Sequence, residues 1–367
     1  MRIGIDASSI VGDKGGVGWH TYHLLQHLLG LPDEMHYLGY VRPGALRDGR
    51  PEGWPGSDKI QWLEVPRWLM RWRGRWDRLD LYHGPNFKMH TTGLCGGVVT
   101  LHDLWLVRHP EYSKKVFGQA ASTQRARETA GRARAVVTVS EFSAREIQEL
   151  YGVPRERIAV IHNGVSDDFA PVRDEALCAE VRRRLELPEA GFLLFVGGAD
   201  PRKNHRGFLQ AVARCRDKLN GRVVVLVGDP EHAMGSYRAT ADEYGLGPLV
   251  RCPGRMNRGD LCVLYTLADL FVFPSLYEGF GMPVLEAMAC GAPTITSNTT
   301  ALPEVAGDAA LLVNPEDPEA MAQAITTALS DDALRDDLRR RGAARSRAFT
   351  WRDAALRTSA LYRTLCS

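Results

Sequence analysis

The sequence predicts an α/β protein made of two doubly wound, Rossmann-like domains. Short runs of apolar and β-branched residues alternate with helical patterns along the chain, which is typical of parallel βαβ units. The alternation begins again near residue 192, and 367 residues exceed the roughly 250–300 at which a single core stops growing. We therefore expect two domains, each able to bury its own core.

The expected strands share an apolar run that ends at a polar or glycine turn. In the first domain they are Arg2–Asp6, Val98–Leu101, Ala135–Val139 and Ile158–Ile161. In the second they are Phe192–Val196, Val223–Val227, Leu249–Cys252, Leu270–Phe273, Pro293–Thr296 and Ala310–Val313. Open α/β sheets place ligands beyond the carboxyl ends of their strands, so the residues that follow these runs are the functional candidates.

The domain boundary is predicted in the segment NGVSDDFAPVRD, where Gly, Asp, Pro and Ser replace the periodic apolar residues. We place residues 1–168 in the N-terminal domain and residues 169–349 in the C-terminal domain. A helix is expected at Pro318–Leu329. Residues 350–367 form an amphipathic final helix that is expected to join the N-terminal domain.

Composition excludes several classes of function. The formal net charge is +2 and there is no long basic or acidic tail, which argues against nucleic acid as a partner. No apolar run approaches the ~18 residues of a membrane span, and the chain opens without the pattern of a signal peptide. Seven cysteines without a CxxC pair are typical of reduced thiols. We expect a cytoplasmic protein.

The segment Phe271–Pro293 has the order strand, loop, helix and turn. Its glycines permit close backbone approach, and Pro283 suits a first helical turn. The helix N-terminus and the amides of Phe280–Met282 form a site suited to a diphosphate. Glu278 and Glu286 flank that site as acceptors for sugar hydroxyls, although a bare pair of glutamates would more often be solvated.

This segment resembles the retaining glycosyltransferases of family 4 (glycosyl transferases group 1), whose signature is two glutamates separated by seven residues. The resemblance covers essentially the whole chain and implies a GT-B fold, in which two Rossmann-like domains face each other across a cleft. It implies that the N-terminal domain binds the acceptor and the C-terminal domain the nucleotide-sugar donor. It also implies that Glu278 and the loop Gly279, Phe280, Gly281 and Met282 hold the donor sugar, and that Glu286 holds the ribose.

A second loop, Gly197–Phe208, follows the first strand of the C-terminal domain and resembles the diphosphate-binding loop of that family. Arg202 offers a bidentate fork to phosphate and Lys203 a point charge. The chain contains no Asp-x-Asp pair to hold a metal on a diphosphate. We therefore expect no metal and no cofactor. Arg202 and Lys203 are expected to be catalytic residues that neutralise the diphosphate as a metal ion would. The alternative is an ordinary solvated basic pair.

The N-terminal domain contributes a glycine loop and two polar residues. Gly15 and Gly16 precede a helix, but the spacing does not match a dinucleotide fingerprint. The resemblance implies that Gly16 lies over the donor phosphate and Gly15 on the acceptor side. It gives His102, at a strand end, a catalytic role as a donor to a sugar hydroxyl, with Asp103 near the acceptor or orienting the loop.

Three further predictions concern the cleft and the donor. His83 and Ser140 end other strands and are cleft-lining candidates on the acceptor side, while Asn163 and Gly164 form an interdomain turn with a structural role. Base recognition is expected around Gly254–Met256, with Arg255 and Met256 near the donor. The sequence of the segment that contains Glu278 and Glu286 most resembles mannosyltransferases of bacterial surface polysaccharide synthesis. We therefore expect GDP-mannose as the donor, with a UDP-sugar as the alternative. The expected acceptor is a glycan or a molecule linked to polyprenyl diphosphate.

One basic and aromatic segment has no part in the roles predicted above. At helical spacing, Trp68, Trp72 and Trp76 lie four residues apart, beside Arg67, Arg71 and Arg75. Such a face suits an anionic membrane surface, so residues 67–78 would attach the protein to the inner face of the cytoplasmic membrane. In the alternative, which we favour slightly from the sequence, the tryptophans pack on the sheet and only the arginines are solvated.

Two other classes of function share this scaffold. One is a sugar-nucleotide epimerase or a phosphorylase, and the other is a noncatalytic nucleotide-sugar or glycan-binding module. A glycogen-type phosphorylase would need a pyridoxal lysine and a longer chain. A binding module would not need both glutamates together with Arg202 and Lys203.

Overall fold

The computed structural model describes residues 1–12, 14–54, 56–89, 96–112, 116–198, 200–228 and 233–367. Contacts divide the chain into two compact units: unit 1 is Met1–Gly164 with Thr350–Ser367, and unit 2 is Val165–Phe349. The predicted boundary, after residue 168, lies four residues beyond this division. The acceptor-binding and donor-binding roles of the two domains stay predictions.

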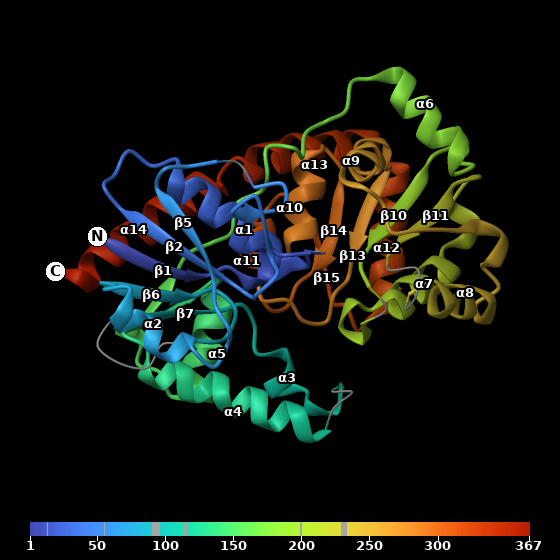
Figure 1. Ribbon diagram of the computed structural model, residues 1–367. Coiled ribbons are helices and arrows are strands. Elements are labelled where there is room, and N and C mark those ends of the chain that lie inside the picture. The colour runs from blue at the N-terminus through green and yellow to red at the C-terminus, as the bar shows by residue number, and fades with distance from the viewer. Residues whose placement is uncertain (13, 55, 90–95, 113–115, 199, 229–232) are drawn as a thin grey trace. The chain divides into compact units, whose positions relative to one another are not determined.

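Unit 1 is built on a parallel sheet with helices on its faces (Figure 1). Its strand order is β5-β2-β1-β6-β7-β8-β9, so the chain starts in the interior of the sheet and builds outward on both sides. The strands are β1 (Arg2–Asp6), β2 (His36–Val41), β5 (Ile60–Glu64), β6 (Leu81–Gly84), β7 (Gly96–Leu101), β8 (Ala135–Thr138) and β9 (Ile158–Val160). A short hairpin, β3 (Leu46–Arg47) and β4 (Arg50–Pro51), is antiparallel.

The helices of unit 1 include the last one of the chain. They are α1 (Gly16–Leu29), α2 (Met70–Trp76), α3 (Trp105–Arg108), α4 (Val116–Arg132), α5 (Glu141–Tyr151) and α14 (Trp351–Cys366). Helix α14 packs against α1 and β6, and its side chains bond to the turn before β2 and to β6. The Ser359 hydroxyl donates to Asp33 at 2.9 Å, and the Tyr362 hydroxyl lies 2.6 Å from His83 Nδ1.

Unit 2 repeats the architecture with strand order β12-β11-β10-β13-β14-β15, all parallel (Figure 1). The strands are β10 (Phe192–Val196), β11 (Val223–Val227), β12 (Val250–Gly254), β13 (Leu270–Phe273), β14 (Thr294–Ser297) and β15 (Leu311–Val313). The helices are α6 (Glu175–Arg184), α7 (His205–Arg214), α8 (Met234–Glu243), α9 (Arg258–Leu267), α10 (Met282–Ala289), α11 (Leu302–Ala306), α12 (Pro318–Ser330) and α13 (Asp332–Ser346).

The central strands of unit 2 are buried on both faces. Leu193, Leu194 and Phe195 on β10 are inaccessible to solvent, as are Phe271 and Val272 on β13. A parallel sheet covered by helices on both faces requires such continuous apolar runs. Side chains also define where helices begin: Asp174, Asn257 and Thr350 each accept a backbone amide of the first turn of the helix that follows.

The prediction of two doubly wound Rossmann-like units is confirmed, and the ten expected strands are present within two residues of their expected ends. The charged segment before the final helix forms α13. Among the described residues, no helix is both long and apolar enough to cross a membrane.

Candidate functional site

Two loops of unit 2 form the candidate site. One follows β10 and the other follows β13, and these strands are hydrogen-bonded neighbours in the sheet. Because neighbouring parallel strands end at the same edge, the two loops emerge side by side. The first passes through a short 3-10 turn (Pro201–Lys203) into α7, and the second ends at the N-terminus of α10.

Two residues with positive φ shape these loops. Gly281 has φ 111°, and a Cβ there would lie 2.6 Å from Leu302 Cδ2, so both the backbone conformation and the close approach require glycine. Asn204 has φ 58°, and its side-chain amide donates to the carbonyls of Pro274 (3.1 Å) and Pro315 (2.7 Å). Asn204 thus ties the first loop to the second.

Glu278 is the centre of the site. Its carboxylate accepts from Lys203 Nζ at 2.5 Å on Oε1 and from Arg202 Nη1 at 3.3 Å on Oε2. The Ser275 hydroxyl donates to Oε1 at 2.7 Å. Only 6% of Glu278 is exposed, so these partners act where water screens them little. The structure therefore brings together three of the predicted catalytic residues.

The charge state of Glu278 follows from this arrangement. Burial alone raises the pKa of a carboxyl group, but the positive charges of Lys203 and Arg202 and the hydrogen bonds from Lys203 and Ser275 outweigh it. The net result is a pKa below the usual 4.5. Glu278 is therefore ionised at neutral pH and can only accept hydrogen bonds, which suits its predicted role toward sugar hydroxyls.

Polar groups from β14 and the segment after it support the loop that carries Glu278. The backbone amide of Glu278 donates to Thr300 Oγ1 at 3.2 Å, and the Ser297 hydroxyl donates to the Ser275 carbonyl at 2.7 Å. The Arg202 carbonyl accepts the backbone amide of Leu276 at 2.7 Å. These three contacts therefore hold the backbone of the loop between Ser275 and Glu278.

Glu286 has a different environment, although it belongs to the same segment. It lies on α10, half-buried, and accepts from the Tyr265 hydroxyl at a long 3.4 Å. Burial raises its pKa to about 7, against the lowering effects of Tyr265 and of the positive charge of Arg258. Arg258 is itself paired with Asp168. Glu286 is consequently divided between acid and carboxylate near neutral pH.

The predicted base-recognition residues lie in the loop between β12 and α9. Gly254 (φ 84°) ends β12, and Asn257 caps α9 by accepting the Asp260 amide. Arg255 is exposed and Met256 is half-buried in this loop. Their placement at a strand end agrees with the expectation, but their role in donor binding stays a prediction.

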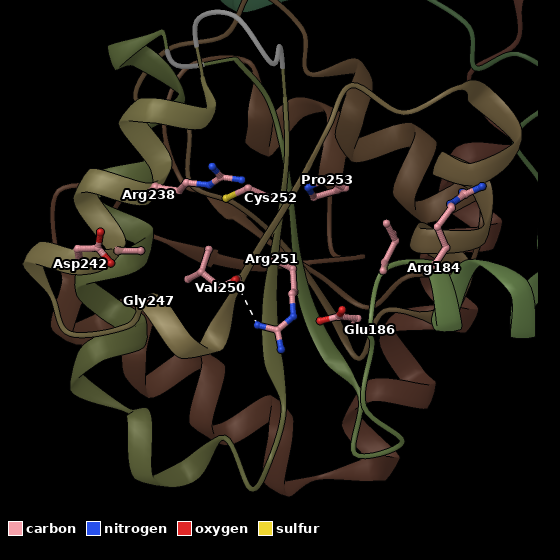
Figure 2. Close-up of a pocket in the computed structure, with 11 residues that line it drawn as sticks. Arg184, Glu186, Arg238, Asp242, Gly247, Val250, Arg251, Cys252 and Pro253 are labelled. Atoms are coloured by element: carbon pink, nitrogen blue, oxygen red, sulfur yellow. Dashed lines mark hydrogen bonds between the residues drawn. The ribbon is translucent and has the colours of Figure 1, made fainter.

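A cavity of about 480 Å³ in unit 2 contains none of the predicted residues (Figure 2). It lies beside β12, and its charged lining is Arg184, Glu186, Arg238, Asp242 and Arg251. Arg184 is paired with Asp260 at 2.6 Å, and Arg251 Nη1 donates to the carbonyls of Pro248 and Val250. Two of its cations thus already have partners within the protein, although Arg251 Nε is buried without one. The cavity is distinct from the cluster of Glu278, Lys203 and Arg202.

His102 is held in one orientation in unit 1. Its Nε2 lies 2.8 Å from the Pro85 carbonyl, which can only accept, so Nε2 carries the proton. Burial lowers its pKa, which keeps the imidazole neutral. Nδ1 is then an acceptor. The expectation that His102 donates to a sugar hydroxyl is corrected accordingly: in this tautomer Nδ1 can only accept a hydrogen bond from a hydroxyl group, and the contact with a sugar stays a prediction.

His83 and Ser140, predicted to line the acceptor side, are fully buried with structural partners. His83 uses both ring nitrogens, toward Tyr362 and Thr100. Ser140 caps α5 by accepting the Ser143 amide at 3.0 Å. The lining roles are therefore wrong for these two residues, because a strand end places a residue near a ligand edge without deciding where its side chain points.

The remaining predicted residues of unit 1 are placed as follows. Asp103 accepts the Trp105 amide at 3.2 Å, which orients the loop, one of its two expected roles. Gly15 and Gly16 are exposed at the start of α1, and a Cβ at either would contact nothing within 4 Å. Gly164 packs so closely that a Cβ would lie 2.0 Å from the Trp351 amide nitrogen, which confirms its structural role.

Comparison with known proteins places this architecture in a family. Residues 14–169 match the model described as Glycosyltransferase Family 4, and residues 179–345 match the model described as Glycosyl transferases group 1. The chain is 35% identical to the O-antigen chain mannosyltransferase B of Escherichia coli, over 83% of this chain and 80% of that protein. The chain belongs to glycosyltransferase family 4. It is therefore a glycosyltransferase, and the predicted resemblance is confirmed.

Solved structures of other proteins share the fold of this family 4 chain. Sucrose-phosphate synthase from Thermosynechococcus elongatus matches with a TM-score of 0.78 and 24% identity, covering 99% of this chain and 98% of that one. The Anabaena protein HepE in complex with UDP-glucose matches with a TM-score of 0.75 and 18% identity, covering 99% of each chain. These likenesses confirm the GT-B fold.

The sequence did not identify several residues that contact the predicted ones within each unit. Ser275 lies three positions before Glu278 in the same loop, so its place in the motif was a usable signal. Thr300, Tyr265 and Arg258 come from other elements and follow no pattern that marks them. His20 also was not predicted: its ring packs edge-on to His102 with centroids 4.6 Å apart, and its Nδ1 lies 2.8 Å from Asn163 Oδ1.

Proposed function

We propose that this family 4 enzyme transfers a mannosyl group, with retention of configuration, from GDP-mannose to a glycan acceptor of bacterial surface polysaccharide synthesis. The relative that supports the sugar and the pathway is the O-antigen chain mannosyltransferase of Escherichia coli. The observation that carries the chemistry is the cluster of Glu278, Lys203 and Arg202 at the ends of β10 and β13.

The cluster supplies two kinds of recognition. Lys203 and Arg202 are cations that hold the negative charge of a donor diphosphate, and the N-terminus of α10 adds its dipole. Glu278 accepts hydrogen bonds from hydroxyl groups of the transferred sugar. In this structure the cations are paired with Glu278 and Asp200, so a diphosphate competes with these carboxylates for them.

Retention follows when departure and attack take place on the same face of the sugar. The bond between the anomeric carbon and the β-phosphate oxygen breaks, and its electron pair leaves with the phosphate. The acceptor hydroxyl oxygen bonds to the anomeric carbon, and its proton passes to the departing phosphate oxygen. Lys203 and Arg202 stabilise the charge that develops on that phosphate, which is the main catalytic contribution.

In this proposal the two fixed cations neutralise the diphosphate without a divalent ion. His102, neutral and oriented by Pro85, accepts a hydrogen bond from a hydroxyl group of the transferred sugar at Nδ1. The acceptor is a glycan, carried in the cell on a polyprenyl diphosphate. Turnover in the presence of EDTA at the rate seen without it supports the metal-free mechanism, and loss of turnover that Mg²⁺ or Mn²⁺ restores contradicts it.

A donor panel tests the sugar nucleotide. With GDP-mannose, UDP-glucose and ADP-glucose at equal concentration, we expect the largest rise in Tm with GDP-mannose, because a ligand at 100 times its Kd adds about 2.7 kcal/mol to the stability of the folded state. NMR of the product then gives the anomeric configuration. Inversion would contradict the retaining mechanism, and a failure to release nucleoside diphosphate with any donor and acceptor would favour a binding module.

A UDP-sugar is the alternative donor. A structural neighbour of the same fold was solved with UDP-glucose, and the backbone around Gly254–Met256 leaves no residue signature that selects the base. The same panel separates the two: a larger Tm rise and faster turnover with a UDP-sugar than with GDP-mannose would replace the proposed donor while leaving the roles of Glu278, Lys203 and Arg202 intact.

A further inference from the structure

Three tryptophans on one short segment of unit 1 are exposed. Trp68 is 71% exposed, Trp72 50% and Trp76 60%, and they lie four residues apart along the segment that contains α2. The Arg67, Arg71 and Arg75 side chains are exposed beside them. We call these six residues the tryptophan face. The sequence favoured tryptophans packed on the sheet, and the structure shows the opposite.

The other side of α2 explains why the tryptophans point outward. Met70 and Gly74 are buried on that side, where Met70 joins the apolar cluster beneath the helix. Arg73 is paired with Asp77 at 2.7 Å, and Asp77 accepts from the Tyr40 hydroxyl at 2.6 Å. These contacts fix the rotation of the helix, so the tryptophan face is held toward solvent by packing.

The charge of this surface is positive. Arg78 adds a fourth exposed arginine, and the single acidic residue between positions 67 and 78 is Asp77, whose carboxylate is engaged by Arg73 and Tyr40. Arg71 lies over the Trp72 ring at 5.0 Å. Arg67 also lines a cavity of about 250 Å³ together with Arg42 and Lys88, where Asp6 is the acidic member of the lining.

We propose that the tryptophan face docks on a membrane surface that contains anionic phospholipids. Indole rings favour the boundary between headgroups and acyl chains, because they are apolar with one polar N–H. Arginines beside them gain from the negative potential of that surface. A protein partner would have to cover three large rings and accept four arginines, whereas a lipid interface supplies both environments at once.

Vesicle sedimentation with the full-length chain tests the proposal. With vesicles of phosphatidylcholine and phosphatidylglycerol, we expect the wild type to co-sediment. The triple variant Arg67→Ala, Arg71→Ala, Arg75→Ala should bind on the order of 100-fold more weakly, since each surface arginine contributes roughly a factor of five. The triple variant Trp68→Ala, Trp72→Ala, Trp76→Ala should bind at least about tenfold more weakly on both anionic and neutral vesicles, through lost apolar burial.

Two matched control variants separate this surface from general charge and hydrophobicity. Arg183, Arg347 and Arg352 are exposed arginines outside the tryptophan face, and Leu312 and Leu356 are apolar residues that are 40% and 47% exposed. Changing either group to alanine should leave vesicle binding within about twofold of the wild type. Because all of these side chains are exposed, urea unfolding should give nearly the same midpoint for every variant.

Three results would overturn the proposal. The first is equal binding of anionic vesicles by the wild type and the Arg67/Arg71/Arg75 variant. The second is an equal loss of binding in the control variants. The third is a wild type that ignores vesicles yet sediments as a dimer that the Trp68/Trp72/Trp76 variant converts to a monomer, which would assign the face to a second copy of this chain.

Discussion

Glu278 and Glu286 occupy one loop and the helix that follows it, yet their environments are opposite. Glu278 is buried between two cations and a hydroxyl group, and its pKa is lowered. Glu286 has one long hydrogen bond from Tyr265, and burial raises its pKa to about 7. Two glutamates eight positions apart therefore behave differently: Glu278 is ionised at neutral pH, whereas Glu286 titrates near it.

The difference has a structural origin. The loop after β10 brings Arg202 and Lys203 to Glu278, because β10 and β13 are neighbours in the sheet. Glu286 lies farther along, on α10, where Tyr265 of α9 is its hydrogen-bond partner and Arg258 is the cation that acts on it. The two glutamates that are proposed to contact the donor thus differ in charge: Glu278 is ionised at neutral pH, whereas the charge of Glu286 depends on pH in that range.

Lys203→Ala gives the largest expected effect. It removes the shorter of the two ion pairs of Glu278 and a cation proposed to stabilise the departing phosphate, so kcat should fall by about 10²–10³. Lys218→Ala, at an exposed lysine of the same unit, is the control and should keep normal turnover. Steady-state kinetics with the preferred donor measures both. A loss confined to KM would assign Lys203 to ground-state binding alone.

The pH dependence of stability should differ in sign between the two glutamates. For Glu286, with a pKa raised from 4.5 to about 7, the stabilising contribution is full below pH 4.5 and is lost as the pH rises through 7. For Glu278, with a lowered pKa, the stabilising contribution is present above pH 4.5 and is lost as the pH falls through the folded-state pKa.

Urea unfolding at pH 5 and pH 8 measures this difference. Relative to Glu286→Gln, the wild type should lose on the order of 3 kcal/mol between these pH values, since each pKa unit is worth about 1.4 kcal/mol. Relative to Glu278→Gln, the free energy of unfolding of the wild type should change little between pH 5 and pH 8. An equal change relative to both variants would show that the two carboxyl groups do not differ as described.

A double-mutant cycle tests how strongly the buried pair is coupled. Lys203→Met should cost about 2 kcal/mol, because Arg202 remains but one buried oxygen of Glu278 loses its cation. Adding Glu278→Gln should recover part of that loss. The exposed pair of Arg206 and Glu243 is the control, and Arg206→Met should cost less than about 1 kcal/mol. Equal costs for the two pairs would contradict the buried environment of Glu278.

The sequence predicted those features that depend on local patterns of residue type along the chain. Two sheets, the Glu278 loop and the Arg202 and Lys203 loop were all predictable, because apolar runs and glycine turns are local. Strands β2 and β5 were not predicted, because Gly39 and the polar residues of β5 interrupt the apolar pattern. For β6, only a strand end at His83 was predicted, without bounds.

The environment of each functional side chain was less predictable. Ser275 and Thr300 support Glu278 through contacts that depend on how β13, β14 and their loops meet in space. His83 and Ser140 end strands as expected but point into the interior. The raised pKa of Glu286 arises from burial by several elements, and no spacing along the chain encodes that.

Tyr265→Phe gives the smallest expected effect and sharpens the comparison at Glu286. The Tyr265 hydroxyl donates to Glu286 and favours its ionised form, so its loss should raise the Glu286 pKa further. The 3.4 Å distance limits the effect to about 1 kcal/mol or less, which moves the midpoint of the stability curve upward by less than about one pH unit. Tyr237→Phe is the control, because the Tyr237 hydroxyl donates to the Gly197 carbonyl at 2.6 Å and its loss should lower stability without moving that midpoint. A midpoint unchanged by Tyr265→Phe would mean that burial alone sets the titration of Glu286.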